Sequence, residues 1–218
     1  MLKAVLFDMD GVIVDTEPLH KKAYFQMFKD FGINVTETLF ETFTGQSTIE
    51  ICRQLCEQFG LRAAPETLVA IKRKHFKVLF DTDDSLALID GVLELIQDYH
   101  TNGVTLVLAS SASMPNINRI FKRFNLDQYF VAKLSGADLP KSKPHPEIFI
   151  KAAEASGHEK SQCIVIEDST NGIKAAKGAG IYCVGYNSLH SKNQDYSLAD
   201  LGVSDFKDIH FSKINKVL

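Results

Sequence analysis

Two acidic side chains follow the first apolar segment of the chain directly. Asp8 and Asp10 come after Ala4–Phe7, and Gly11 follows them. Carboxylates at the end of a buried strand are costly unless a cation or phosphate chemistry holds them there. Gly11 permits a sharp turn that would bring backbone amides towards a bound phosphate. These residues suit a metal or phosphate site, and an acidic strand end before an ordinary loop is the alternative that they leave open.

Hydroxyl and ammonium groups follow later apolar segments. Ser110 and Ser111 come directly after Val104–Ala109, at a junction where a hydroxyl and exposed amides would suit a phosphate oxygen. Serine is also a common helix N-cap, so this signal alone is weak. Lys143 precedes Pro144 and lies in a loop whose prolines restrict the backbone. A rigidly held lysine would suit an anion, although an exposed loop lysine is the other interpretation.

A second pair of acids closes another apolar segment. Glu167 and Asp168 are adjacent and follow Cys163–Ile166. Like charges in this position repel each other unless a divalent cation lies between them, and hard carboxylate oxygens suit Mg²⁺. All four segments together favour phosphate chemistry, because every alternative interpretation would have to hold independently.

The elements that must position these residues alternate between strands and helices. Apolar, β-rich runs predict strands at Ala4–Met9, Val104–Ala109, Ala132–Leu134, Cys163–Glu167 and Tyr182–Val184. Amphipathic patterns predict helices near Val92–His100, Ser113–Phe124, Pro146–Ala155 and Asn171–Lys177. The strands are almost continuously apolar, which is typical of parallel strands buried on both faces. We therefore expect an α/β fold with a Rossmann-like open parallel sheet, whose functional residues gather beyond the carboxyl ends of the strands.

A helical insertion interrupts this alternation after the first strand. Amphipathic patterns predict helices at Leu19–Phe31, Thr48–Phe59 and Pro65–Phe80, with no buried strand among them. We expect an α/β core domain of residues 1–15 and 84–218 and a small all-helical domain of residues 16–83.

Composition excludes several classes of protein. The 218 residues are 45% hydrophobic and 23% charged, so the chain is globular. A net charge of −3 offers no footprint for nucleic acid, and the basic run Lys72–Lys74 fits the exposed face of a helix. No apolar run reaches the ~20 residues of a membrane span. The four cysteines form no CxxC pair, which fits a cytoplasmic protein, and we expect a monomer.

These motifs resemble those of the haloacid dehalogenase (HAD) superfamily. The sequence DMDG at Asp8–Gly11 is similar to its first motif, and Ser110, Lys143 and the pair Glu167–Asp168 are similar to its second, third and fourth motifs, in the same order. The likeness runs along essentially the whole chain. The helical insertion resembles the C1 cap of the β-phosphoglucomutase-like and sugar-phosphate phosphatase branch.

The resemblance implies roles for the core residues. Asp8 would be the nucleophile that forms an aspartyl-phosphate, and Asp10 would be the general acid and base. Lys143 would neutralise the nucleophile and the phosphate. Ser110 and the amide of Ser111 would hold phosphoryl oxygens.

It also implies a Mg²⁺ site and a substrate-selecting cap. The ion would be bound by Asp8, Asp168 and the main-chain oxygen of Asp10, with Glu167 as a ligand or close by.

In the cap, residues 15–18, which include Thr16, would form a hinge. Gly45 would belong to a specificity loop at residues 44–48. His20 lies where this branch places a cap histidine, and an ordinary exposed helix residue is the alternative.

The function that these residues favour is a Mg²⁺-dependent phosphatase of small phosphomonoesters, in particular sugar phosphates. The alternative within the family is a β-phosphoglucomutase, which interconverts β-glucose 1-phosphate and glucose 6-phosphate. Such mutases show an arginine where this chain has Thr48, and polar residues where it has Ala112–Met114. A phospho-accepting receiver module is a distant alternative, which Asp10 and the helical insertion disfavour.

Overall fold

The chain divides into two compact units in the computed structural model, which describes residues 1–43, 48–83, 86–188, 191 and 193–216. One unit comprises residues 1–15 and 87–218, and the other comprises residues 16–86. The first is an α/β unit and the second is helical.

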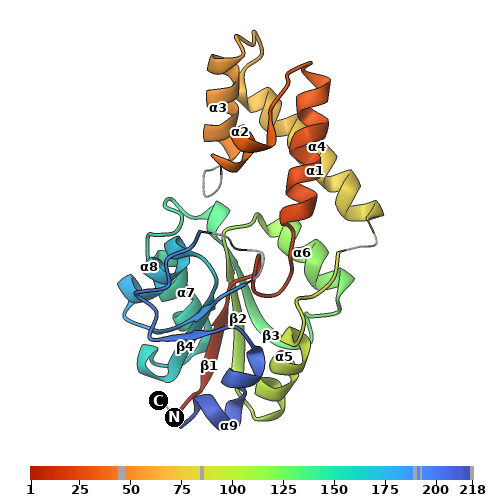
Figure 1. The fold of residues 1–218 in the computed structure, drawn as a ribbon. Helices are drawn as coiled ribbons and strands as arrows, with labels where there is room; N and C mark the ends of the chain where they lie inside the picture. Colours follow the sequence, from red (N-terminus) through yellow and green to blue (C-terminus); the bar gives the residue numbers. More distant parts are fainter. Residues whose placement is uncertain (44–47, 84–85, 189–190, 192, 217–218) are drawn as a thin grey trace. The chain divides into compact units, whose positions relative to one another are not determined.

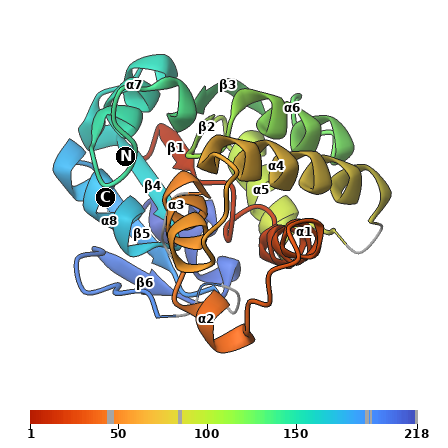
Figure 2. The same cartoon turned by 90° about the horizontal axis from the view of Figure 1, so that it is seen from above.

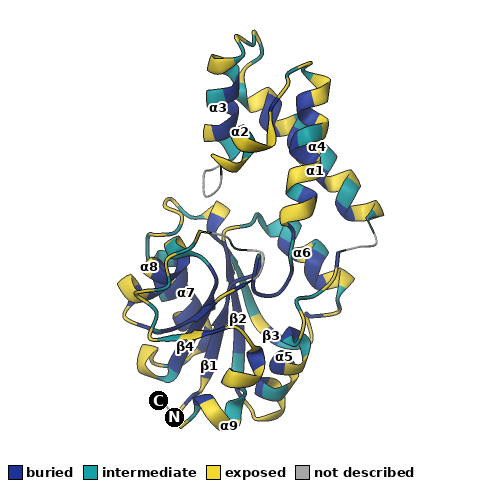
Figure 3. Ribbon diagram, in the orientation of Figure 1, coloured by how far each residue is buried: buried dark blue, intermediate teal, exposed yellow. Residues whose placement is uncertain are grey.

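One parallel sheet forms the centre of the α/β unit. Its strands are β1 (Ala4–Phe7), β2 (Thr105–Ser110), β3 (Phe130–Ser135), β4 (Cys163–Glu167), β5 (Tyr182–Tyr186) and β6 (Leu201–Val203). They are hydrogen-bonded in the order β3-β2-β1-β4-β5-β6, and each pairing is parallel. The central strands β1 and β4 are wholly buried (Figure 3). The predicted α/β fold with an open parallel sheet is confirmed.

Helices cover both faces of this sheet. They are α5 (Val92–Thr101), α6 (Met114–Arg123), α7 (Glu147–Ser156) and α8 (Thr170–Ala179), and a short α9 (Phe211–Ile214) lies near the C-terminus. Helices α7 and α8 pack together on one face, and α5 and α6 contact β2 and β3 from the other (Figures 1 and 2). The core between α7, α8 and the strands is built from small and branched apolar side chains such as Ala152, Val165 and Ile173.

The helical unit contains α1 (Glu17–Asp30), α2 (Glu37–Glu41), α3 (Thr48–Gln58) and α4 (Pro65–Thr82). Helix α4 packs against both α1 and α3. The core of the helical unit contains Tyr24, Met27 and Phe28 of α1 together with Leu55 and Leu68. This all-helical insertion after the first strand was predicted; helix α2 was not. No helix among the described residues is long and apolar enough to cross a membrane.

Several details of the elements differ from the sequence prediction. Strand β1 ends at Phe7 and not at Met9, because the chain turns and the amides of Ile13 and Val14 donate to the Met9 carbonyl oxygen. Strand β6 was missed, since three residues with Gly202 at their centre form no apolar run. The proposed hinge at residues 15–18 is partly helical, because α1 already begins at Glu17.

Candidate active site

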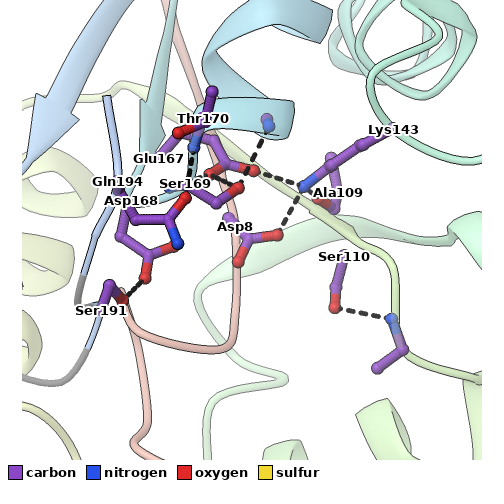
Figure 4. A network of polar contacts seen from close by, with 12 residues as sticks. Asp8, Ala109, Ser110, Lys143, Glu167, Asp168, Ser169, Thr170, Ser191 and Gln194 are labelled. Carbon is purple, nitrogen blue, oxygen red and sulfur yellow. Dashed lines mark hydrogen bonds and ion pairs between the residues drawn. The ribbon is translucent and has the colours of Figure 1, made fainter. Parts of the chain in front are cut away.

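The strand order brings the predicted residues to one edge of the sheet. Strand β1 lies between β2 and β4. Asp8 follows β1, Ser110 ends β2 and Glu167 ends β4, so their side chains emerge at neighbouring carboxyl ends (Figure 4). The amide of Asp8 still donates to the Ile166 carbonyl oxygen at 3.0 Å, which ties this residue to β4. The ligand site of an open α/β sheet is expected at this edge.

Lys143 joins the ends of three strands. Its Nζ lies 2.5 Å from Asp8 Oδ1 and 2.7 Å from Glu167 Oε1, and it donates to the Ala109 carbonyl oxygen at 2.9 Å. The lysine side chain is only 6% exposed. Burial alone would lower the pKa of Lys143, but the carboxylates of Asp8 and Glu167 outweigh it and raise that pKa. The ammonium is therefore a fixed positive charge.

Three carboxylates form a cluster of the kind that can hold a metal ion. One oxygen from each of Asp8, Glu167 and Asp168 lies within 4.8 Å of the others, and all three residues are buried. Burial raises the pKa of Asp8 well above its usual range despite the Lys143 ammonium, and Glu167 and Asp168 raise it further. Burial and the Glu167 charge raise the pKa of Asp168 to about 7. Three buried acids against one ammonium leave an excess of negative charge, which a divalent cation on these oxygens would balance.

Glu167 is held at the start of α8. Its Oε2 accepts hydrogen bonds from the amide and the hydroxyl of Ser169, both at 2.9 Å. Ser169 also caps the helix, because its Oγ accepts from the Gly172 amide. A Cβ atom on Gly172 would lie 1.7 Å from Glu167 Oε1. Glycine is therefore needed at position 172 for the carboxylate to lie against the helix.

The two predicted phosphate-binding serines differ in burial. Ser110 is 1% exposed, and its Oγ accepts a hydrogen bond from the Ala112 amide at 3.0 Å. Because Ser110 Oγ is the acceptor in this bond, its hydroxyl proton can be donated to an anion. Ser111 is exposed. Helix α6 begins at Met114 with Ser113 as its N-cap, so neither serine caps that helix.

Among the described residues, the carboxylate cluster consists of Asp8, Glu167 and Asp168 and does not include Asp10. Asp10 is partly buried, and its charge contributes to the raised pKa of Asp168. Gly11 has φ of +80°, and a Cβ atom there would lie 1.9 Å from Asp168 Oδ2. The glycine of the DMDG motif thus allows the turn to pass directly against the Asp168 carboxylate.

The predicted residues of the helical unit are only partly described. Thr16 is buried and accepts the His20 amide through its carbonyl oxygen, whereas Gly45 lies outside the described residues. His20 is not an ordinary exposed residue: its ring stacks on Phe76 at 4.2 Å between centroids, and its Nδ1 lies 2.7 Å from Lys72 Nζ. Burial and the Lys72 charge lower the pKa of His20 well below its usual range, so the neutral ring accepts from the ammonium.

Sequence reasoning missed Lys72. The prediction that residues 72–74 form an exposed basic face is wrong at this position, because Lys72 is 5% exposed. Its Nζ lies over the rings of Tyr24 and Phe76, 4.8 and 5.3 Å from their centroids. The available signal was the spacing: Lys72 is four residues from Leu68 and Phe76, which share the buried face of α4.

Comparison with known proteins identifies the family of this chain. The sequence model of the haloacid dehalogenase-like hydrolases matches residues 5–186. The chain is 31% identical over 201 residues to a phosphorylated carbohydrates phosphatase of Thermotoga maritima, covering 92% of each chain. Among solved structures, CbbY from Rhodobacter sphaeroides in complex with phosphate has a TM-score of 0.85 at 25% identity, covering 99% of this chain and 100% of that one.

A β-phosphoglucomutase from Clostridium difficile is similar as well, with a TM-score of 0.79 and 25% identity over 99% of this chain and 96% of that one. The likeness therefore extends both to a protein named as a phosphatase and to a protein named as a mutase. The family match spans the strands that carry Asp8, Ser110 and Glu167 and the loop that carries Lys143. This chain is an enzyme of the haloacid dehalogenase-like hydrolase family, in its β-phosphoglucomutase-like branch.

Proposed function

We propose that this enzyme is a Mg²⁺-dependent phosphatase that hydrolyses small phosphomonoesters, in particular sugar phosphates, through an aspartyl-phosphate on Asp8. The observation that carries the proposal is the buried Asp8 carboxylate, held 2.5 Å from Lys143 beside two further acids at the sheet edge. The name of the Thermotoga maritima relative supports a phosphorylated carbohydrate as substrate. The proposal includes that the enzyme is monomeric and cytoplasmic and binds neither nucleic acid nor a membrane.

In the first step an Asp8 oxygen attacks phosphorus, the bond to the ester oxygen breaks, and Asp10 gives a proton to the leaving alkoxide. Lys143 holds positive charge against the nucleophile throughout, and the Ser110 hydroxyl donates to a phosphoryl oxygen. Mg²⁺ bound to Asp8, Asp168 and the main-chain oxygen of Asp10, with Glu167 as a ligand or beside it, would balance the phosphoryl charge.

In the second step Asp10, now a carboxylate, takes a proton from water as the water oxygen attacks the phosphorus of phospho-Asp8. The bond between phosphorus and the Asp8 oxygen breaks, which releases inorganic phosphate and restores both aspartates. Asp10 can act first as an acid and then as a base because it loses its proton in the first step.

A mutase is the alternative, and residues outside the cluster disfavour it. A mutase must bind a second phosphate group, for which a bidentate arginine is well suited. At position 48, the first residue of α3, the chain has a threonine, which cannot form the bidentate contact of an arginine. Met114 is the first residue of α6, and its side chain has no donor for a phosphate. Water is then the expected acceptor of the phosphoryl group.

The proposal predicts strict metal dependence. Removal of a divalent cation costs several kcal/mol of transition-state stabilisation, so excess chelator should lower phosphate release by at least about 10²-fold. Added Mg²⁺ should restore it. The measurement is phosphate release from a panel of hexose and pentose monophosphates, with β-glucose 1-phosphate tested with and without a bisphosphate activator. Full activity in chelator would contradict the metal site, and efficient isomerisation with little phosphate release would establish the mutase.

We further propose that the helical unit selects the substrate, since the sheet-edge residues bind phosphate and metal but not the leaving group. His20→Asn should change the ratio of kcat/KM between hexose and pentose monophosphates by about tenfold. The Mg²⁺ concentration for half-maximal activity should stay the same.

His75→Asn is the matched control, because His75 contacts Asp30 within the same unit and is not a predicted site residue. An unchanged substrate ranking in His20→Asn, or an equal change in both variants, would remove His20 from the specificity site.

A further inference from the structure

The segment that follows β5 makes hydrogen bonds to the turn that carries Asp168. Tyr196 Oη donates to the Asp168 carbonyl oxygen at 2.9 Å. Ser191 Oγ donates to Asp168 Oδ2, and Figure 4 shows the serine reaching the carboxylate from the segment after β5. The main chain and the side chain of one aspartate are thus held from a part of the chain more than twenty residues away.

Gln194 and Asp195 are hydrogen-bonded to Thr170, two residues after Asp168. The Thr170 amide donates to Gln194 Oε1 at 2.8 Å, and the Asp195 amide donates to Thr170 Oγ1 at 2.7 Å. Thr170 is the first residue of α8. The turn between β4 and α8 is therefore hydrogen-bonded to residues after β5 both at Asp168 and at Thr170, where the helix starts.

Tyr196 is itself fixed by packing. A Cβ atom on Gly185 of β5 would lie 3.0 Å from Tyr196 Cδ1, so the ring lies directly against the strand. The ring also packs on the apolar core between the sheet and helices α7 and α8. The hydroxyl is therefore presented to Asp168 by a ring with little freedom to move.

Asp168 differs from the other two carboxylates in what holds it. Among the described residues, Lys143 donates to Asp8 and Glu167, whereas the Asp168 carboxylate receives its hydrogen bond from Ser191. Gly11 lies against the same Oδ2 oxygen. With Oδ2 fixed in this way, the direction of the other oxygen is restricted.

We propose that Tyr196 and Ser191 are positioning residues for Asp168, and that they thereby tune the affinity of the three-carboxylate cluster for a divalent cation. The inference rests on the metal site of the proposed function. Groups that orient metal ligands typically change metal affinity by about 10–100-fold when they are removed.

The test uses Tyr196→Phe, which removes one oxygen and keeps the packed ring, and Ser191→Ala. Titration calorimetry of the whole protein with Mg²⁺, without substrate, should show Kd raised about tenfold in each variant. In steady-state phosphate release, the Mg²⁺ concentration for half-maximal activity should rise by the same factor. The KM for the sugar phosphate at saturating Mg²⁺ should stay the same, which a general loss of structure would not produce.

Tyr182→Phe and Ser197→Ala are the matched controls, since Tyr182 begins β5 at the end remote from the site and Ser197 is exposed. Both should bind Mg²⁺ as the wild type does. Unchanged Mg²⁺ affinity in Tyr196→Phe and Ser191→Ala, or equal weakening in the controls, would overturn the inference. Wild-type binding of Mg²⁺ without phosphate release would overturn only the proposed function. No binding by the wild type would overturn both.

Discussion

Asp8→Asn is expected to lower phosphate release by roughly 10⁵-fold or more, the scale seen when a covalent nucleophile is removed. The amide is similar in size to the carboxylate, so it should fit at the end of β1, but its oxygen is too weak a nucleophile to attack phosphorus. Asp10→Asn should be less severe, about 10²–10⁴-fold, because it removes proton transfer and leaves the nucleophile in place. Single-turnover phosphate release separates the two variants.

An exposed aspartate provides the control for both substitutions. Asp127 forms a surface ion pair with Lys133 and is 58% exposed. Asp127→Asn should keep wild-type turnover. Wild-type turnover in Asp8→Asn would show that phosphate transfer does not pass through Asp8, and a covalent mechanism would then have to be abandoned. Equal losses in Asp8→Asn and Asp10→Asn would remove the division of roles between them.

The positions of the core site residues followed from local pattern. Each of Asp8, Ser110 and Glu167 ends or follows an apolar run, and parallel strands must place such ends at one edge of the sheet. The sequence therefore predicted which residues meet, without any knowledge of the strand order. It also predicted the helical insertion, because long amphipathic patterns are the most reliable local signal.

Contacts that depend on long-range packing were not predictable in this way. Lys72 looked like part of an exposed basic run, and its burial depends on how α4 packs against α1. Ser191 and Tyr196 lie in a segment without regular pattern, and nothing local shows that they reach Asp168. The need for glycine at position 172 likewise becomes visible only when Glu167 is seen against the helix.

Lys143→Met is expected to damage both folding and catalysis, since the lysine is the positive charge that contacts the carboxylates of Asp8 and Glu167. Breaking a buried ion pair by removing one partner costs about 3–5 kcal/mol, and the side chain is only 6% exposed, so solvent screens little of this loss. Loss of a preorganised charge at the phosphoryl group should lower kcat by about 10³-fold.

The loss of stability should depend on pH with a definite sign. Burial already raises the pKa of Asp8 and of Asp168 above their values in an unfolded chain. A carboxyl group whose pKa is raised by folding favours the folded state when it is protonated, and this contribution disappears as pH rises through the raised pKa. Lys143→Met should therefore lose less stability at pH 5 than at pH 8 in metal-free buffer. Urea denaturation at the two pH values measures the difference.

Two further variants separate charge balance from catalysis. Lys151→Met removes an exposed lysine that pairs with Glu147, and it should change the free energy of unfolding by no more than about 0.5 kcal/mol. In Lys143→Met/Glu167→Gln one of the two carboxylates that lose the ammonium is neutralised, so part of the stability should return, because an unpaired buried carboxylate costs more than the missing contact. Activity should remain low, since the nucleophile still lacks its ammonium partner. A double variant that stayed as unstable as Lys143→Met would show that the lysine acts mainly through packing on Phe149, over whose ring its Nζ lies at 4.8 Å.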